Sequence, residues 1–463
     1  MNAFYKSPSL YVVFLIMTVF SFLSCKKNGP QILPTSIDIK VDTSNVAVQW
    51  AEMSLYTIRF SSSNTPTYAS RSLGYLGLAM FESIVPGYPE YQSLEGQLNG
   101  LMLPKILPNQ KYDWIITLNS SQSTLLKLLY PVPENSHRYV HEKIDSVNKA
   151  ILHYRSKTND KSVVDNSLKF GKDIAEAIYN WSLNDGGSMG FQRNYDPMFA
   201  FPSDLSYWIP PLVGQTISRY PLHPTWGKNR TFVSSNSNLA IPAIIPYSVN
   251  PGSAYYQQYK AVYDKNKQLT QEEKEIAAWW GDDPTETASP PGHSYSLATI
   301  ASKQTKASII KAAEAYAKTG LAVADAFINC WKVKVIYFNE RPSSYVRANI
   351  DSTWVQFWPE PPFPAFPSGH SIQSAAAATV LTNVFGDNFA FKDHSLEGHR
   401  RYDFPGFDGL RYQARSFKSF NEAADECAYS RFLGGIHTQQ DNETGTSMGK
   451  IVGQNVVSLK WKK

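Results

Sequence analysis

Cysteine is scarce in this chain, and the cysteines that it has stand far apart. The 463 residues include only 3 cysteines, at positions 25, 330 and 427. Disulfide scaffolds and thiolate metal sites need cysteines in pairs or close groups, so the sequence excludes a metal centre built from them. Cys330 and Cys427 each lie in an apolar helical pattern. We expect structural thiols there, with a disulfide as the alternative in an exported protein.

Runs of basic residues are missing as well. The net charge of +5 comes from lysines and arginines dispersed along the chain, which excludes the basic groove of a nucleic-acid-binding protein. After the first 25 residues, no segment approaches the roughly 20 apolar residues that a membrane-spanning helix needs. Regular β-alternation and fixed-period repeats are also absent. With 43% hydrophobic and 18% charged residues, the chain is expected to form a globular body.

The N-terminus resembles a bacterial export signal. Lys6 precedes an apolar run over residues 10–23, which is short for a membrane span and fits the core of a signal peptide. The run stops at Cys25 and a polar stretch follows, as in a bacterial lipobox, although Phe22 replaces the preferred leucine. We therefore expect a signal peptide over 1–24, lipidation of Cys25 and a tether over 25–44.

This arrangement predicts an exported protein in the periplasm or on the outer membrane of a Gram-negative bacterium. Its contact with the membrane is expected only through the lipid on Cys25. The alternative is an ordinary secretory signal or a single N-terminal anchor.

Helical periodicity dominates residues 45–463, which we expect to form a single large domain. Apolar residues recur there at intervals of three and four, as on buried helix faces. Residues 186–254 break the pattern with many Pro, Gly, Ser and aromatic residues, and we expect this segment to wrap the helices and line a pocket mouth. The predicted fold is all-α, a helical bundle with long irregular loops. Helices are expected from Val46, after Pro66, over 162–183, from a capping box at Thr270 and Glu273, over 302–317, 320–338 and 367–385, and near the C-terminus.

The first chemical motif is KVIYFNERP, from Lys334 to Pro342. Lys334 and Arg341 are seven residues apart, so on one helix they would share a stripe about 10 Å long. Pro342 is expected to end that helix. Two cations on an apolar helix are costly to bury without an anion. Taken alone, the motif is also consistent with two surface residues whose aliphatic side-chain atoms pack on the protein while their charged ends reach the solvent.

The second motif is PSGH, from Pro367 to His370. We expect it to open a helix with Pro367 at the first helical position and with Ser368 and Gly369 in the first turn. Backbone N–H groups without partners there form an anion site, and glycine lets the anion come close. His370 follows and can exchange a proton. The alternative is an ordinary helix start with a surface histidine.

The third motif is SRFLGGIHTQQD, which ends at Asp441. Gly434 and Gly435 are expected to end a helix after Arg431, and His437 to begin the next one with Asp441 four residues later. A carboxylate that takes the proton of one ring nitrogen leaves the other nitrogen with a lone pair. That lone pair would make His437 a nucleophile or a metal ligand. The alternative is a histidine–aspartate pair on a helix surface.

Together the three motifs predict one oxyanion site. Fixed cations, a helix N-terminus with a hydroxyl group and two histidines suit a tetrahedral or trigonal-bipyramidal anion such as phosphate or vanadate. Lys-x6-Arg-Pro, Pro-Ser-Gly-His and Ser-Arg-x5-His-x3-Asp resemble the signature of the type 2 phosphatidic acid phosphatase / vanadium haloperoxidase superfamily. Every signature residue is present at the required spacing between Lys334 and Asp441.

The resemblance implies two related chemistries in one pocket. In the haloperoxidases, the residue matching His437 is the axial ligand of vanadate, and the residue matching His370 handles protons as hydrogen peroxide oxidises a halide to a hypohalous species. In the phosphatases, the same two positions form a phosphohistidine and protonate the leaving alcohol, while the match of Asp441 orients the nucleophile. The residues that match the groups holding the oxyanion are Lys334, Arg341, Ser368, Gly369 and Arg431.

Several features favour the haloperoxidase branch, with hydrogen peroxide, a halide and an organic acceptor as substrates. The chain lacks a membrane-spanning bundle and has a long helical N-terminal half. Trp331 and Phe363 match aromatic residues near the site of vanadium chloroperoxidases, which extends the signature to 331–441; alternatively, both are core aromatics. In WWGDDPTETASPPGH, Asp282 or Asp283 matches an aspartate that pairs with the site arginines.

Two other functions stay open at this point. The main alternative is a phosphatase that hydrolyses phosphate monoesters through a phosphohistidine at His437 and needs no vanadate. The third is a protein that binds an oxyanion and turns over neither class of substrate.

Overall fold

The computed structural model describes residues 45–463 apart from 63, 217, 401–406 and 408. The expected signal peptide, the lipidated Cys25 and the tether lie outside these residues. Residue contacts divide the chain between Lys40 and Val41, and the described residues all belong to the second unit. Across them, no helix has the length and apolar character that crossing a membrane requires.

The described residues form 13 α-helices and one small antiparallel sheet, which confirms the predicted all-α fold. The strands β1 (Phe391–Asp393) and β2 (Arg415–Phe417) pair Phe391 with Phe417 and Asp393 with Arg415. The helices are α2 (Val46–Phe60), α3 (Pro66–Glu82), α4 (Trp114–Leu129), α5 (Arg138–Ser156), α6 (Lys161–Ser182), α7 (Ala254–Asn266), α8 (Gln271–Trp279), α9 (Ser289–Gln304), α10 (Ile309–Tyr337), α11 (Pro342–Asn349), α12 (Gly369–Phe385), α13 (Phe420–Leu433) and α14 (Gln439–Val457).

Helices were expected separately over 302–317 and 320–338, but residues 302–304 are the end of α9, and the single helix α10 covers 309–337. It runs unbroken for 29 residues and includes Gly320. A β-carbon at Gly320 would lie only 2.3 Å from the backbone oxygen of Leu73 on α3. This glycine therefore serves the close approach of two helix backbones and does not interrupt the helix.

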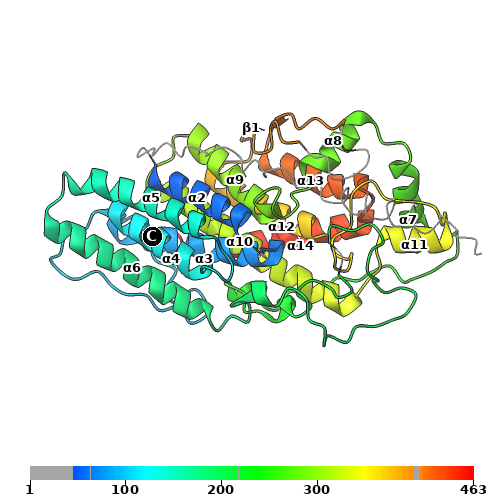
Figure 1. Ribbon diagram of the computed structural model, residues 1–463, viewed down its shortest axis with the longest axis horizontal. Helices are drawn as coiled ribbons and strands as arrows, with labels where there is room; N and C mark the ends of the chain where they lie inside the picture. The colour runs from blue at the N-terminus through cyan, green and yellow to red at the C-terminus, as the bar shows by residue number, and fades with distance from the viewer. Residues whose placement is uncertain (1–44, 63, 217, 401–406, 408) are drawn as a thin grey trace, which may run out of the picture. The chain divides into compact units, whose positions relative to one another are not determined.

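Three helices that carry the sequence motifs pack directly on one another. Helix α12 contacts both α10 and α14, and α10 also contacts α3 (Figure 1). Along α14, Gly445, Gly449 and Gly453 face α12; a β-carbon at Gly449 would lie 2.2 Å from the backbone oxygen of Ile372. The backbones of α12 and α14 are therefore in contact near their N-termini, which are the ends that carry PSGH and the His–Asp pair.

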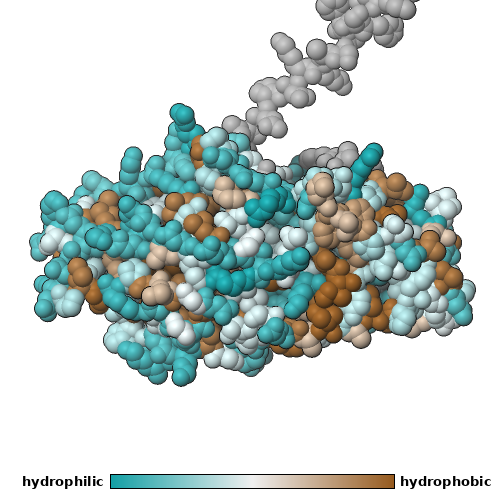
Figure 2. Space-filling model, turned by 90° about the horizontal axis from the view of Figure 1, so that it is seen from below, coloured by the Kyte–Doolittle hydropathy of each residue, from teal (hydrophilic) through white to brown (hydrophobic). Residues whose placement is uncertain are grey.

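The segment 186–254 is irregular, as predicted, but buried polar groups hold it in place. Its only helices within the described residues are the short 3-10 turns η2 (Gly190–Gln192), η3 (Trp226–Lys228) and η4 (Ser234–Asn236). The buried Asp325 of α10 accepts the N–H groups of Phe232 and Val233 at 2.7 and 3.1 Å. Figure 2 shows a largely hydrophilic face on which hydrophobic residues gather in a strip. The segment itself exposes several large hydrophobic side chains, among them Met198, Leu205 and Leu212.

Candidate active site

Lys334 and Arg341 belong to two different helices, and the prediction that they share one is wrong. Phe338 ends α10 with a left-handed backbone (φ 46°), and its N–H bonds to the oxygen of Lys334 at 2.8 Å. Arg341 is the N-cap of α11, which begins at Pro342. The proline therefore starts the next helix, where its missing N–H has no cost. The turn still brings the two cations together, because both donate to the oxygen of Pro364, at 2.6 and 3.5 Å.

The PSGH motif opens α12 two residues later than predicted, at Gly369. Pro367 lies before the helix, and Ser368 is its N-cap. The Oγ of Ser368 accepts the backbone N–H of Ser371 at 3.3 Å and faces the Oγ of Ser371 at 2.9 Å. A serine oxygen can cap N–H groups and a proline cannot, which explains the difference. Ser368 and Gly369 therefore stand at the positive end of the helix dipole, as an anion site requires.

His437 precedes α14 and does not begin it. Thr438 is the N-cap, and Asp441 completes a capping box with it. The Oδ2 of Asp441 accepts both the N–H of Thr438 at 2.9 Å and Nδ1–H of His437 at 3.0 Å. One carboxylate thus caps the helix and orients the ring. With Nδ1 as the donor, Nε2 keeps its lone pair, which faces Nη1 of Arg341 at 3.1 Å.

The cations Lys334, Arg341 and Arg431 are completely buried, each with 0% exposure. Lys334 donates to the oxygens of Pro364 and Ala365 at 2.6 and 2.7 Å. Such contacts orient an ammonium but do not neutralise it. Burial accordingly lowers the pKa of Lys334, lowers that of Arg341 to about 10 and lowers that of Arg431. The three cations are therefore held in place while much of their charge remains uncompensated.

Burial and the neighbouring cations keep both site histidines neutral. Burial is the largest cause that lowers the pKa of His437 far below its usual value, and Arg341 adds to it. Burial and then Arg431 lower the pKa of His370 in the same way, while backbone hydrogen bonding by Gly281 and Trp280 acts in the opposite direction. A neutral imidazole can accept a proton or a metal, so both rings are prepared for these roles.

Two buried polar atoms at this site have no partner among the described residues: Nη1 of Arg431 and Nε2 of His370. The other nitrogens of Arg431 are occupied, because Nε donates to Oγ of Ser430 at 2.9 Å and Nη2 donates to the oxygen of Ala277 at 2.7 Å. Buried polar groups usually have partners, so these two atoms are available to a ligand. A donor set of two guanidinium groups, an ammonium, a hydroxyl and helix N–H groups fits a vanadate or phosphate anion.

A cavity of about 510 Å³ opens onto these atoms. Trp331 and Phe363, which resembled haloperoxidase aromatics, both line it, with their ring centroids 4.9 Å apart. The ring of Phe363 also lies 5.2 Å from both Nζ of Lys334 and Cζ of Arg341. The lining includes Gly369, His370, Arg431, His437, Asp282 and Asp283, together with Tyr195, Gln215 and Leu222 of the irregular segment.

Asp282 and Asp283 reach the same cavity but have different partners. The Oδ2 of Asp282 bonds to Nδ1 of His293 at 2.7 Å, whereas Asp283 accepts a hydrogen bond from Gln215. Both carboxylates also oppose the effect of burial on the pKa of Arg431. The expected aspartate–arginine pairing is thus present as a charge effect on Arg431, and the direct partner of Asp282 is His293.

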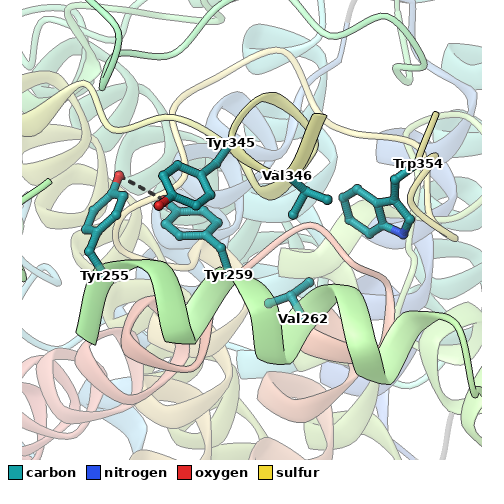
Figure 3. Packing of buried hydrophobic residues seen from close by; sticks show 6 residues of the cluster. All are labelled: Tyr255, Tyr259, Val262, Tyr345, Val346 and Trp354. Carbon is teal, nitrogen blue, oxygen red and sulfur yellow. Dashed lines mark hydrogen bonds between the residues drawn. The ribbon is translucent and has the colours of Figure 1, made fainter. Parts of the chain in front are cut away.

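Two further groups support the site and were not singled out from the sequence. His293 ends the stretch WWGDDPTETASPPGH, so its position was available but its partners were not. Glu340, next to Arg341, accepts the hydroxyl of Tyr255 at 3.0 Å. Figure 3 shows Tyr255 and Tyr259 of α7 facing Tyr345 of α11. This aromatic cluster packs against α11 and so helps to fix its N-cap Arg341.

Comparisons with known proteins agree with this geometry. The family model of the VCPO second helical-bundle domain matches residues 314–462. The chain is 31% identical to the solved structure of a bacterial vanadium-dependent iodoperoxidase, with a TM-score of 0.73, over 89% of this chain and 94% of that one. No curated protein matches the sequence.

The solved structures of a bacterial vanadium-dependent chloroperoxidase share the fold at lower identity. The holo form is 16% identical with a TM-score of 0.63, over 85% of this chain and 92% of that one. The apo form is 15% identical with a TM-score of 0.64, over 84% and 92%. On the strength of the match at 31% identity, which extends over nearly the whole length of both chains, this chain belongs to the vanadium haloperoxidase superfamily.

Proposed function

We propose that this protein uses bound vanadate and hydrogen peroxide to oxidise halide ions to hypohalous species. The observation that carries the proposal is the pair of partnerless buried atoms, Nη1 of Arg431 and Nε2 of His370, beside three fully buried cations. The likeness to an iodoperoxidase at 31% identity supports the haloperoxidase branch. Iodide, the most easily oxidised of the common halides, is the substrate that we propose first.

Vanadate, when bound, supplies a Lewis-acidic centre that activates hydrogen peroxide for attack by the halide. His437 offers the lone pair on Nε2 as a ligand, and Asp441 keeps that ring in the required tautomer through Nδ1. Lys334, Arg341 and Arg431 neutralise the anion and keep its position fixed. Because these groups are already held by backbone oxygens, little reorganisation is needed when the anion enters.

His370 is the group that moves protons. Its Nε2 is buried without a protein partner at the cavity, so it can take a proton from hydrogen peroxide and return it to the departing oxygen. Ser368 and the N–H of Gly369, at the start of α12, are hydrogen-bond donors that would hold oxygens of the oxyanion.

The test compares two activities of the purified protein. After loading with orthovanadate, iodide and bromide oxidation by hydrogen peroxide is measured; the vanadate-free protein is assayed with a phosphate monoester. We expect halide oxidation that depends on vanadate and little ester hydrolysis. Ester hydrolysis that vanadate inhibits, without halide oxidation, would assign the phosphatase chemistry to the same residues. Binding of vanadate or phosphate with turnover of neither substrate class would support the anion-binding alternative.

The proposal extends to export and anchoring. The sequence pattern around Cys25 suggests that the protein is a lipoprotein held outside the cytoplasm. Incorporation of a labelled fatty acid tests this directly, and Cys25→Ala is the control. The protein should carry the label only when Cys25 is present, whereas equal labelling of both forms would contradict the assignment.

A further inference from the structure

A buried histidine lies between two carboxylates next to the proposed oxyanion site. We call this group the Asp–His–Asp bridge; it consists of Asp282, His293 and Asp393. Nδ1 of His293 bonds to Oδ2 of Asp282, and Nε2 bonds to Oδ2 of Asp393, both at 2.7 Å. All three side chains are at most 2% exposed. Because both ring nitrogens face carboxylate oxygens, this geometry favours a proton on each nitrogen, which makes the ring an imidazolium.

The environment of His293 favours this charged form. Burial alone would lower its pKa, but the charges of Asp282 and Asp393 and their hydrogen bonds raise it to about 10. Trp280 stacks on the ring with the centroids 4.5 Å apart and the planes at 20°. The bridge therefore carries one positive and two negative charges at neutral pH, which is a net charge of −1.

The Asp–His–Asp bridge connects the small sheet to the wall of the cavity. Asp393 is the last residue of β1 and also accepts Nε1–H of Trp279 at 3.2 Å. Asp282 lines the cavity and has a left-handed backbone, with φ 50°. A residue other than glycine rarely adopts this conformation unless its surroundings hold it there. The bond to His293 is such a restraint on Asp282.

The segment 277–283, which includes Asp282, contacts both Arg431 and His370, the two residues whose buried atoms lack partners among the described residues. The oxygen of Ala277, at the end of α8, accepts Nη2 of Arg431 at 2.7 Å. Trp280 and Gly281 interact with His370 through their backbones. The charges of Asp282 and Asp283 act on Arg431, and the charge of His293 acts on His370. The positions of Arg431 and His370 and the electrostatic potential around them thus both depend on this segment.

We propose that His293 is a positioning residue: its positive charge offsets one of two carboxylates beside Arg431 and so allows an oxyanion to bind there tightly. The inference rests on the proposed function, because it assumes that the cavity takes an oxyanion. Without the imidazolium, the bridge would hold two uncompensated negative charges, which repel an incoming anion. His293 itself faces two carboxylates and not the cavity anion, so it acts only through Asp282 and the segment that follows α8.

The test measures the dissociation constant of orthovanadate by equilibrium dialysis of the full-length protein. In His293→Gln the net charge of the bridge changes from −1 to −2. One added charge in a buried site, at an effective dielectric constant of about 20, weakens binding of an anion about tenfold. In His293→Gln/Asp393→Asn the net charge returns to −1, and we expect affinity to recover to within about threefold of the original protein.

The outcomes are distinct. Failure of the unaltered protein to bind vanadate would overturn the proposed function, and this inference with it. If that protein binds vanadate and His293→Gln binds it equally well, the inference alone is wrong. Equally weak binding by the single and the double variant would assign His293 a packing role and overturn the charge argument.

A second variant covers the case in which His293→Gln does not fold. Asp393→Asn keeps the bond between His293 and Asp282 and removes one negative charge. The charge argument then requires vanadate affinity at least equal to that of the original protein. Affinity that falls tenfold in a folded Asp393→Asn protein would overturn it.

Discussion

Arg71 and Arg431 are both buried, yet only Arg71 has a carboxylate as a direct partner within the described structure. In the N-terminal helices, Nε of Arg71 contacts Asp185 at 2.6 Å and Nη2 donates to the oxygen of Ser182 at 2.7 Å. Tyr75 donates to the same carboxylate at 2.8 Å. In the site, Arg431 bonds to neutral oxygens, and its Nη1 has no partner among the described residues.

The pKa values follow this difference. Burial is the largest effect on the pKa of either guanidinium and lowers it. Around Arg71, Asp185 together with Tyr75 and Tyr68 outweighs burial and raises the pKa, whereas the pKa of Arg431 is lowered. The first region neutralises its buried charge within the protein. The second leaves Nη1 of Arg431 without a partner among the described residues, so this atom is available to a ligand. The comparison therefore separates an arginine that a buried carboxylate neutralises from one that has no carboxylate as a direct partner among the described residues.

The largest effect is expected from His437→Ala, which removes the proposed ligand of the oxyanion. Loss of a partner that orients a metal ligand costs roughly 10–100-fold in affinity or activity, so His437→Ala, which removes the ligand itself, should cost more than about 100-fold. Vanadate-dependent iodide oxidation and vanadate binding are the measurements. His153→Ala, on the distant helix α5, is the matched control. Retained activity in His437→Ala would refute the site.

The second prediction separates proton transfer from anion binding. His370→Ala should reduce turnover about 10²–10⁴-fold, the usual contribution of a general acid–base group. Its vanadate affinity should fall less than that of His437→Ala, because His437 supplies the ligand and His370 moves protons. Turnover is measured by iodide oxidation and vanadate affinity by equilibrium dialysis, for each of the two variants. An equal loss of affinity in the two variants would contradict the separate roles.

The third prediction applies one substitution to both arginines. Arg71→Gln leaves Asp185 buried with an uncompensated charge, which typically costs 3–5 kcal/mol of unfolding free energy. Arg431→Gln removes a charge that has no carboxylate as a direct partner among the described residues, so stability should change little or increase, while vanadate affinity falls. Denaturant unfolding and dialysis of both variants give the two quantities. If both substitutions lowered the unfolding free energy equally, or both lowered vanadate affinity equally, the distinction between the two arginines would be wrong.

The fourth and smallest effect is stabilisation by the ligand. A site that binds only in the folded state adds about 2.7 kcal/mol at a ligand concentration of 100 times the dissociation constant. Orthovanadate should therefore raise the unfolding free energy of the original protein and of Arg71→Gln alike. Arg431→Gln at the same vanadate concentration should show much less. Equal stabilisation of all three proteins would place the bound anion elsewhere.

Much of the fold could be predicted because its elements are signalled locally. The capping box of Thr270 and Glu273 starts α8 where expected, and the apolar periodicity over 162–183 matches α6 within one residue at each end. The break of α10 was wrongly predicted near Gly320, because a glycine that admits another backbone looks like a glycine that ends a helix. Only the distant Leu73 distinguishes the two cases.

The candidate site was predicted as a set of residues but not as an arrangement of elements. The three motifs meet, although the helix boundaries around Arg341, Ser368 and His437 all differ from the prediction by one or more residues. Capping decides these boundaries, and it depends on side-chain contacts as well as on spacing. The Asp–His–Asp bridge was not predicted: Asp282 and His293 lie in one stretch that the sequence singled out, but Asp393 is one hundred residues beyond His293 and lies in no motif, so the pairing could not be seen.

The glycine face of α14 has a consequence for how this chain can change in length. Gly445 and Gly449 must point at α12, while Asp441, four residues before Gly445, must point at His437. One residue inserted or deleted between Asp441 and Gly445 would rotate the glycines by about 100° around the helix relative to the carboxylate. Either the two helices would separate or the ring would lose its orientation. The short stretch from His437 to Gly449 therefore tolerates substitutions at its exposed positions but admits neither insertion nor deletion.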